Sequence, residues 1–332
     1  MTSNAGRYSA ERITRDDIEI VRLYDSGSQT EVLIAPSVGN NAYQMTVKGK
    51  RVFWSPVSSV REFKARRSFA GNPFLEPWAN RLDQDAFYAN GVRYALNPEL
   101  KNYSRDANGK PIHGLLAYAP EWQVIRVHAG ADSAEVTSRL DFARYPRYMA
   151  QFPFAHSIEM TYRLSGTELQ VETAIHNQSS EPMPLAIGFH PYFQVNDAPR
   201  DEWTLHIAAK EHVLLSNVLI PTGERKPVSG PDPVSLKDNR LDDVYTSLIR
   251  GDDGRAEFRV KGRREQITVA YGPKYQVAVV YAPPGKDFVC FEPMTGLTNA
   301  FNLHHAGLYP ELQSIPPGAT WEESFWIRAT GF

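Results

Sequence analysis

A regular alternation of apolar and polar residues in the middle of the chain constrains the fold most. Between residues 158 and 164 every second residue is apolar, and after the turn Ser165-Gly166-Thr167 the alternation resumes over residues 169–175. Side chains of a β-strand point alternately to its two faces, so a period of two predicts two strands. The short turn between them predicts an antiparallel hairpin with one buried face.

Similar strand patterns recur along the chain, whereas no stretch keeps a helical period over three turns. The 24 prolines and 22 glycines are spread between these patterns and do not gather in one linker. Short strands without intervening helices are typical of antiparallel sheets. We therefore predict an all-β fold, a large antiparallel β-sandwich with few short helices, as a single domain over residues 1–332. Residues 1–17 are polar, and we expect a poorly ordered lead-in there.

Composition excludes several classes of function. The 36 basic and 38 acidic residues give a formal net charge of −2, which favours neither nucleic acid nor a membrane surface as partner. Cys290 is the only cysteine, so the chain cannot form an internal disulfide. The first residues have no apolar signal-peptide core, and no window is long and apolar enough to span a membrane. We expect a cytoplasmic protein; the sequence leaves the oligomeric state open.

His190 stands in the stretch Gly188-Phe189-His190-Pro191-Tyr192-Phe193, where an apolar strand runs into a proline. Proline disfavours helix at the residue before it, so the imidazole is presented from extended backbone. Histidine exchanges protons near neutral pH. The alternative is a core histidine bonded to backbone.

A second candidate region ends in Asn80-Arg81, ahead of a predicted hairpin that turns at Asn90-Gly91. Arg81 offers five fixed donors to ligand oxygens. The alternative is a surface arginine paired with Asp83 or Asp85.

Two further loops and one strand add polar candidates. His113 precedes Gly114, which lets backbone approach a ligand closely. The adjacent carboxylates Asp242 and Asp243 follow a long polar loop, and either could accept sugar hydroxyls or close a turn.

Glu292 ends the apolar strand 288–291, where burial would raise the pKa of its carboxyl. Its alternative role is a salt bridge to a neighbouring strand. Cys290 shares a strand face with Glu292, and we interpret this cysteine as a small buried hydrophobe.

Two histidines and one carboxylate could also hold a metal. The sequence lacks the His-Glu-x-x-His pattern, and none of the nine histidines has Asp or Glu two positions later. We therefore expect no metal site and no cofactor.

Together these blocks resemble the aldose 1-epimerase, or galactose mutarotase, family. The resemblance rests on Pro77-Trp78-Ala79-Asn80-Arg81, Ile112-His113-Gly114, the His190 stretch and Phe291-Glu292-Pro293, and it covers about residues 18–330. It implies a β-sandwich with a sugar pocket. It also implies that Glu292 is the catalytic base, His190 the catalytic acid and His113 a second active-site histidine. Arg81, Asn80 and Asp242 would bind substrate, with Asp243 as the alternative to Asp242.

The resemblance implies interconversion of the α and β anomers of a free hexose by acid and base catalysis. The chain departs from galactose-specific members in the segment 294–299, so the identity of the sugar stays open. One alternative is a hexose-6-phosphate epimerase, for which Arg61, Lys64, Arg66 and Arg67 could form a basic cluster. Another is a noncatalytic carbohydrate-binding protein.

Overall fold

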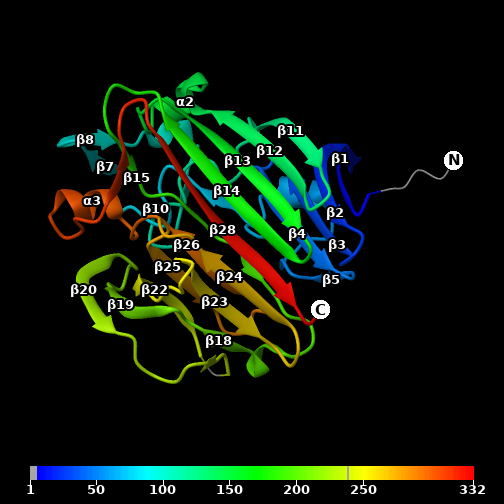
Figure 1. Ribbon diagram of the computed structural model, residues 1–332. Helices are drawn as coiled ribbons and strands as arrows, with labels where there is room; N and C mark the ends of the chain where they lie inside the picture. The colour runs from blue at the N-terminus through cyan, green and yellow to red at the C-terminus, as the bar shows by residue number, and fades with distance from the viewer. Residues whose placement is uncertain (1–5, 238) are drawn as a thin grey trace.

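The computed structural model describes residues 6–237 and 239–332 and consists mainly of antiparallel strands (Figure 1). The largest sheet has nine strands in the order β11-β12-β13-β14-β28-β24-β23-β18-β21. Their bounds are Gln123–Ala129 (β11), Ala134–Asp141 (β12), His156–Ser165 (β13), Glu168–Asn177 (β14), Thr320–Thr330 (β28), Gln266–Tyr271 (β24), Ala256–Lys261 (β23), Thr204–His206 (β18) and Val234–Ser235 (β21). The C-terminal strand β28 lies between β14 and β24 and joins the two halves of this sheet (Figure 1).

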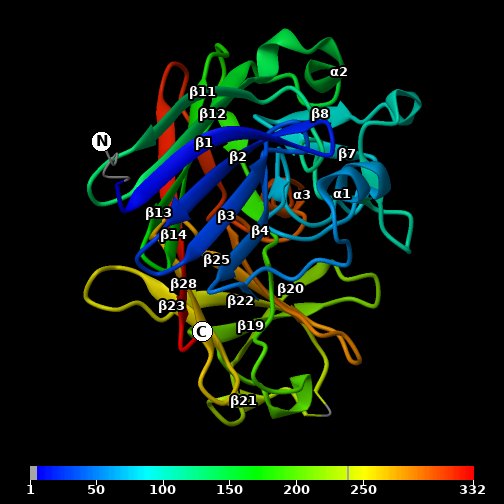
Figure 2. The ribbon, with the colours of Figure 1, turned by 90° about the vertical axis from the view of Figure 1, so that its right-hand side faces the viewer.

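Two smaller sheets form the opposite layer. The five-stranded sheet contains Tyr8–Arg15 (β1), Ile18–Asp25 (β2), Thr30–Ala35 (β3), Asn41–Val47 (β4) and Lys50–Arg51 (β5). The eight-stranded sheet contains Pro221–Pro227 (β20), Ala209–Leu215 (β19), Leu241–Leu248 (β22), Val277–Ala282 (β25), Val289–Met294 (β26), Gly188–Phe189 (β16), Tyr192–Phe193 (β17) and Phe74–Leu75 (β6). Strands β1 and β2 contact β11, β12 and β13, as Figure 2 shows from the side. A bridge between Phe53 and Phe193 connects the two smaller sheets.

Short pairs of strands and three short helices complete the fold. The strands are Ala86–Ala89 (β7), Val92–Ala95 (β8), Ser104–Arg105 (β9), Pro111–Ile112 (β10), Met183–Leu185 (β15) and Gln313–Ile315 (β27). The helices are Val60–Arg66 (α1), Pro146–Met149 (α2) and Ala300–His305 (α3), with 3-10 turns at Pro98–Leu100, Phe142–Arg144 and Arg200–Glu202. None of the helices within residues 6–237 and 239–332 has the length and apolar character that crossing a bilayer requires.

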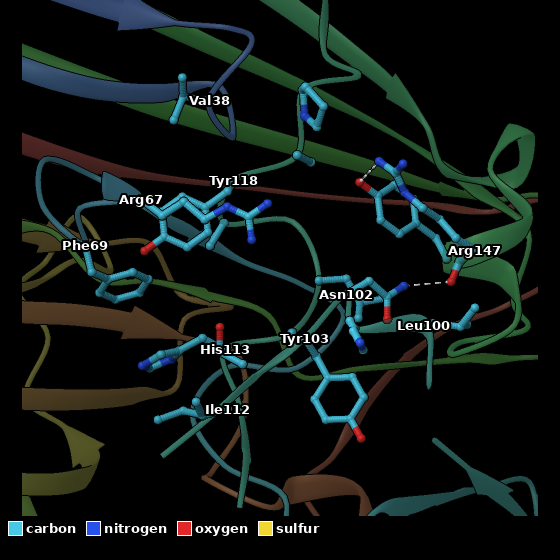
Figure 3. Close-up of a pocket in the computed structure, with 18 of the residues that line it drawn as sticks. Val38, Arg67, Phe69, Leu100, Asn102, Tyr103, Ile112, His113, Tyr118 and Arg147 are labelled. Atoms are coloured by element: carbon cyan, nitrogen blue, oxygen red, sulfur yellow. Dashed lines mark hydrogen bonds between the residues drawn. The ribbon is translucent and has the colours of Figure 1, made fainter. Parts of the chain in front are cut away.

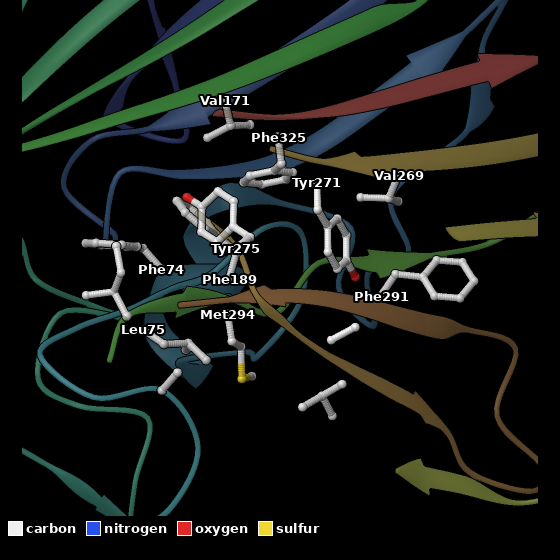
Figure 4. Packing of buried hydrophobic residues seen from close by; sticks show 14 of the residues in the cluster. Phe74, Leu75, Val171, Phe189, Val269, Tyr271, Tyr275, Phe291, Met294 and Phe325 are labelled. Carbon is white, nitrogen blue, oxygen red and sulfur yellow. The ribbon is translucent and has the colours of Figure 1, made fainter. Parts of the chain in front are cut away.

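Apolar side chains from both layers meet between the sheets (Figure 4). Phe189 of β16 packs on Phe325 of β28 with ring centroids 4.8 Å apart, and Phe291 of β26 is fully buried nearby. Burying each of these side chains contributes about 1.5–3 kcal/mol to folding. Because Phe291 faces this core, its neighbours Cys290 and Glu292 face the other side of the sheet.

The predicted all-β fold and its central hairpin are confirmed. Strands β13 and β14 pair from His156 to Asn177 with Tyr162 opposite Val171, and the Asn90-Gly91 turn joins β7 to β8. Alternation thus identified both the strands and their buried face.

The prediction of a poorly ordered lead-in is wrong for the described residues of that segment. Strand β1 pairs with β2 over eight residues, and Asp16 and Asp17 between them both have positive φ. Two positive φ values form the tight turn that suits an antiparallel hairpin. Salt bridges between the strands, such as Arg22 with Glu11 at 2.9 Å, explain why a polar sequence forms an ordered strand here. Residues 1–5 lie outside the described residues.

Candidate active site

His190 lies at a break between two short strands that both pair with β26. Gly188 pairs with Met294 and Tyr192 pairs with Cys290, so the same antiparallel register sets His190 opposite Glu292. Pro191 has no N–H for continuous pairing, and the His190 N–H instead donates to the Pro73 carbonyl at 3.0 Å.

The side chains of His190 and Glu292 are in contact. His190 Nε2 lies 3.2 Å from Glu292 Oε1, and the two side chains are 9% and 2% exposed. Residues directly opposite in an antiparallel pair bring their side chains together on one face, which accounts for this distance. Glu292 Oε2 and His190 Nδ1 are buried and have no hydrogen-bond partner among the described residues.

His113 completes a group of three rings in contact. Its ring centroid lies 5.4 Å from that of His190, and Phe69 stacks on the His113 ring at 4.9 Å while meeting His190 edge-on at 5.0 Å. The His113 N–H donates to the Asn80 carbonyl at 2.8 Å. Gly114 follows with a φ of +63°, and a Cβ at this position would lie 2.2 Å from the Glu76 carbonyl oxygen. Glycine is therefore required for this approach of the two segments.

Arg81 is held beside the two histidines by Asp106. Arg81 Nε donates to Asp106 Oδ2 at 2.7 Å, and another guanidinium nitrogen of Arg81 donates to Asn80 Oδ1 at 2.9 Å. The alternative pairing of Arg81 with Asp83 or Asp85 is wrong. Although burial opposes ionisation of Asp106, the hydrogen bonds from Arg81 and from backbone N–H groups lower the pKa of its carboxyl.

Asp242 and Asp243 lie on opposite faces of β22. Asp242 pairs with Tyr281, and Tyr281 pairs with Cys290, so Asp242 shares the face that carries Glu292. Asp243 points away and forms an ion pair with His212 at 3.0 Å. Burial raises the pKa of the Asp242 carboxyl, and the positive charge of Arg81 offsets part of this rise. Of the two aspartates, Asp242 is the one that faces the site.

Burial shifts the pKa values of His190 and Glu292 toward their uncharged forms. It lowers the pKa of His190 to about 3, with a smaller effect from the positive charge of Arg81. It raises the pKa of Glu292 well above its usual value, and the negative charge of Asp242 adds to this while Arg81 opposes it. Burial also lowers the pKa of His113 well below its ordinary value. Both shifts favour the uncharged forms of this pair, a neutral imidazole and a protonated carboxyl.

The sequence model for aldose 1-epimerases matches residues 29–328 of this chain. The chain belongs to the aldose 1-epimerase family.

Solved structures agree with this family assignment. A galactose mutarotase-like protein from Clostridium acetobutylicum is 20% identical, with a TM-score of 0.86 over 98% of this chain and 99% of that one. A protein from Synechocystis is 26% identical, with a TM-score of 0.74 over 96% and 98%. Galactose 1-epimerase from Lactobacillus acidophilus is 14% identical, with a TM-score of 0.74 over 99% and 100%. At identities of 14% and 20%, the TM-scores of 0.74 and 0.86 show a shared fold and nothing beyond it.

In this aldose 1-epimerase family member, a cavity of about 560 Å³ lies beside the three rings and shares Phe69 and His113 with them (Figure 3). Lys64, Arg67, Lys101 and Arg147 line it, and its described lining contains no aspartate or glutamate. Two of the four residues of the predicted basic cluster thus reach the cavity. The other two are paired elsewhere, Arg61 with Asp17 and Arg66 with Glu62.

The structure brings Asn80, Arg81, His113, His190 and Glu292 together and sets Asp242 on the same face of the sheet. Sequence reasoning missed Phe69 and Asp106. Asp106 is followed by Asn108-Gly109, a turn signal, but nothing in the sequence connects it to Arg81. Phe69 has no local signal, because its role comes from packing between two histidines that lie far away in sequence.

Proposed function

We propose that this protein interconverts the α and β anomers of a free hexose without a cofactor. The observation that supports this most is the 3.2 Å contact between His190 Nε2 and Glu292 Oε1 in a buried site. Opening a cyclic sugar requires removal of a proton from the C1 hydroxyl and delivery of a proton to the ring oxygen. One base and one acid in contact meet both needs.

In the proposed reaction Glu292 is the base and His190 is the acid. Moving the carboxyl proton of Glu292 to the imidazole of His190 creates the carboxylate and imidazolium that ring opening needs. Glu292 then takes the C1 proton as His190 protonates the ring oxygen, giving the open-chain aldehyde. Rotation about the C1–C2 bond and the reverse proton transfers close the ring as the other anomer. Placement of each group of this kind is worth about 10²–10⁴-fold in rate.

The other facing residues would bind the sugar. Arg81, fixed by Asp106, offers its remaining donors to hydroxyl oxygens, and its positive charge favours the ionised form of Glu292. Asp242 would accept hydrogen bonds from hydroxyls, Asn80 holds the Arg81 guanidinium, and His113 would donate where negative charge builds on oxygen.

The test follows the optical rotation of freshly dissolved α-glucose and α-galactose with and without protein. We expect the protein to speed equilibration and Glu292→Gln to lose about 10²–10⁴-fold of that rate. Asp242→Asn should raise KM, and Asp243→Asn is the matched control, because Asp243 faces away from the site. Equal activity of Glu292→Gln and the unmodified protein would refute the assigned base. Sugar binding without acceleration would instead identify a noncatalytic carbohydrate-binding protein.

A phosphorylated hexose is the second candidate substrate. Lys64, Arg67 and Lys101, which line the neighbouring cavity, favour it because cations are suited to a phosphate group, whereas Arg147 in the same lining is paired with Glu121. Comparing glucose with glucose 6-phosphate separates the two substrates. Arg67→Gln should slow only the phosphorylated sugar, and Arg66→Gln is its control, because Arg66 pairs with Glu62 at 2.8 Å and is absent from the cavity lining. Equal effects of both variants would remove this candidate.

We also propose that the protein acts in the cytoplasm on a small sugar and has neither nucleic acid nor a membrane as partner. The near balance of charges and the single buried cysteine support this. Fractionation of cells that express the protein at native level tests it.

A further inference from the structure

A buried cysteine stands next to the acid and base pair and has no part in the proposed reaction. Cys290 is fully buried in β26, two residues before Glu292 on the same face, and lies opposite Tyr192 in the register that places His190 opposite Glu292. One nitrogen of His190, the sulfur of Cys290 and one carboxylate oxygen of Glu292 all lie within 4.8 Å of one another.

We propose that His190, Cys290 and Glu292 form an inhibitory site for Zn²⁺ or a chemically similar thiophilic cation, which competes with the sugar. Imidazole nitrogen, thiolate sulfur and carboxylate oxygen are the three donor types that zinc prefers.

The observed distances suit this ion. Tetrahedral zinc with bonds of about 2.0–2.3 Å brings its ligand atoms to about 3.3–3.6 Å from one another. The nitrogen and oxygen of His190 and Glu292 are already 3.2 Å apart. The cysteine sulfur closes the remaining distance by a shift of about 1.2 Å at most, from 4.8 Å to about 3.6 Å, which a partial rotation about χ1 supplies.

The charges also balance. A divalent cation with one thiolate and one carboxylate carries no net charge, which a site as buried as this one requires. Binding would release the thiol proton and the proton shared by His190 and Glu292. Glu292 Oε2, which has no hydrogen-bond partner in the described ranges 6–237 and 239–332, is available as a second oxygen ligand.

Competition with the sugar follows from the atoms that are used. This inference rests on the proposed function in that respect, because the sugar would place its reacting oxygens against His190 Nε2 and Glu292. A cation bound to the same atoms removes both the acid and the base. The ion is therefore an inhibitor here, and chelation should preserve or raise the activity.

The first experiment measures mutarotation in metal-buffered solutions of increasing free Zn²⁺. We expect inhibition that EDTA reverses and that high sugar concentration overcomes. Cys290→Ala should keep the basal rate of mutarotation. The zinc concentration needed for half inhibition should rise by more than roughly 10–100-fold, which is the loss of metal affinity when a residue that only supports a ligand is removed. Cys290→Ser, closer in volume, serves the same purpose if the alanine variant is unstable. His212→Gln, which removes a half-exposed histidine outside the site, should leave the sensitivity unchanged.

The second experiment does not depend on activity. Co²⁺ bound through sulfur should give a thiolate charge-transfer band in the near ultraviolet, present in the unmodified protein and absent from Cys290→Ala. Zinc sensitivity that survives in both cysteine variants, or absence of the band, would overturn the proposal. Loss of mutarotation on chelation, with recovery on adding zinc, would also overturn it and make the ion catalytic. If the protein shows no mutarotation with any sugar, the proposed function fails while the Co²⁺ spectrum still decides the metal site.

Discussion

Asp106 gives the sharpest test of how the site is built, because it touches Arg81 and no other candidate residue. The bond from Arg81 Nε to Asp106 Oδ2 is 2.7 Å long, and the two side chains are 15% and 6% exposed. Asp106 Oδ1 separately accepts the N–H groups of Asn108 and Lys110 at 2.9 and 2.8 Å. In Asp106→Asn the amide oxygen can keep these two turn bonds while the charged bond to Arg81 is lost.

The expected effect follows from that single loss. A hydrogen bond between charged groups contributes about 1.5–3 kcal/mol, so the free energy of unfolding should fall by about 2 kcal/mol. Arg81 would also lose its fixed orientation. If about 1.4 kcal/mol of sugar binding depends on that orientation, KM rises about tenfold. The change in kcat should be smaller, since His190 and Glu292 keep their backbone positions.

The assays are urea unfolding and polarimetric kinetics, with Asp85→Asn as control. Asp85 forms a comparable bond with Arg105 at 2.8 Å, but both side chains are well exposed, and such pairs contribute about 0–1 kcal/mol. The pKa of Asp106 is lowered by folding, so its stabilising effect is present above the ordinary aspartate pKa of about 3.9. The difference between the unmodified protein and Asp106→Asn should therefore shrink in acid. A loss of stability with unchanged KM would refute the orienting role and leave Asp106 as a turn residue.

Two further predictions concern the pair of reacting groups and the approach of His113. The rate constant kcat/KM should follow a bell-shaped pH profile. It should fall in acid near pH 3, where the imidazole of His190 is protonated, and fall in alkali, where the carboxyl of Glu292 loses its proton. A profile that is flat from pH 3 to 10 would contradict this. Gly114→Ala should lower the free energy of unfolding by about 2–5 kcal/mol, because the new residue would have to adopt left-handed backbone and its Cβ would overlap with Glu76. Gly166→Ala, also at positive φ but with open space around it, should lower it by only about 1–2 kcal/mol. Equal losses in urea unfolding would show that the overlap with Glu76 does not matter.

The sequence predicted the strands well where one face is buried and the other is not. Residues 158–164 and 169–175 alternate, and the structure has the predicted hairpin there with Tyr162 opposite Val171. Strand β1 escaped prediction because only Tyr8 on it is buried. Its order comes from cross-strand charge pairs and from contact with β11, neither of which leaves a periodic pattern in the sequence.

The candidate site could be assembled residue by residue, but its pairings could not. His190 and Glu292 each stood out by local context, and a register that places residue 190 opposite residue 292 requires the whole sheet. The choice between Asp242 and Asp243 depended on which face of β22 points to Glu292, and a shift of one residue would have reversed it. Asp106 and Phe69 were missed because their partners are distant in the chain.

The placement of His190 and Glu292 opposite each other on neighbouring strands has a consequence for how this enzyme family can diversify. The separation between His190 and Glu292 depends on backbone pairing within β16, β17 and β26, whereas the cavity next to them is lined in part by helix α1 and by residues 100–104. Mutations and insertions in those peripheral segments can change which ligand groups fit the cavity. The positions of His190 and Glu292 stay the same. Selection can thus alter the shape and charge of the cavity without having to rebuild the pairing of these two residues.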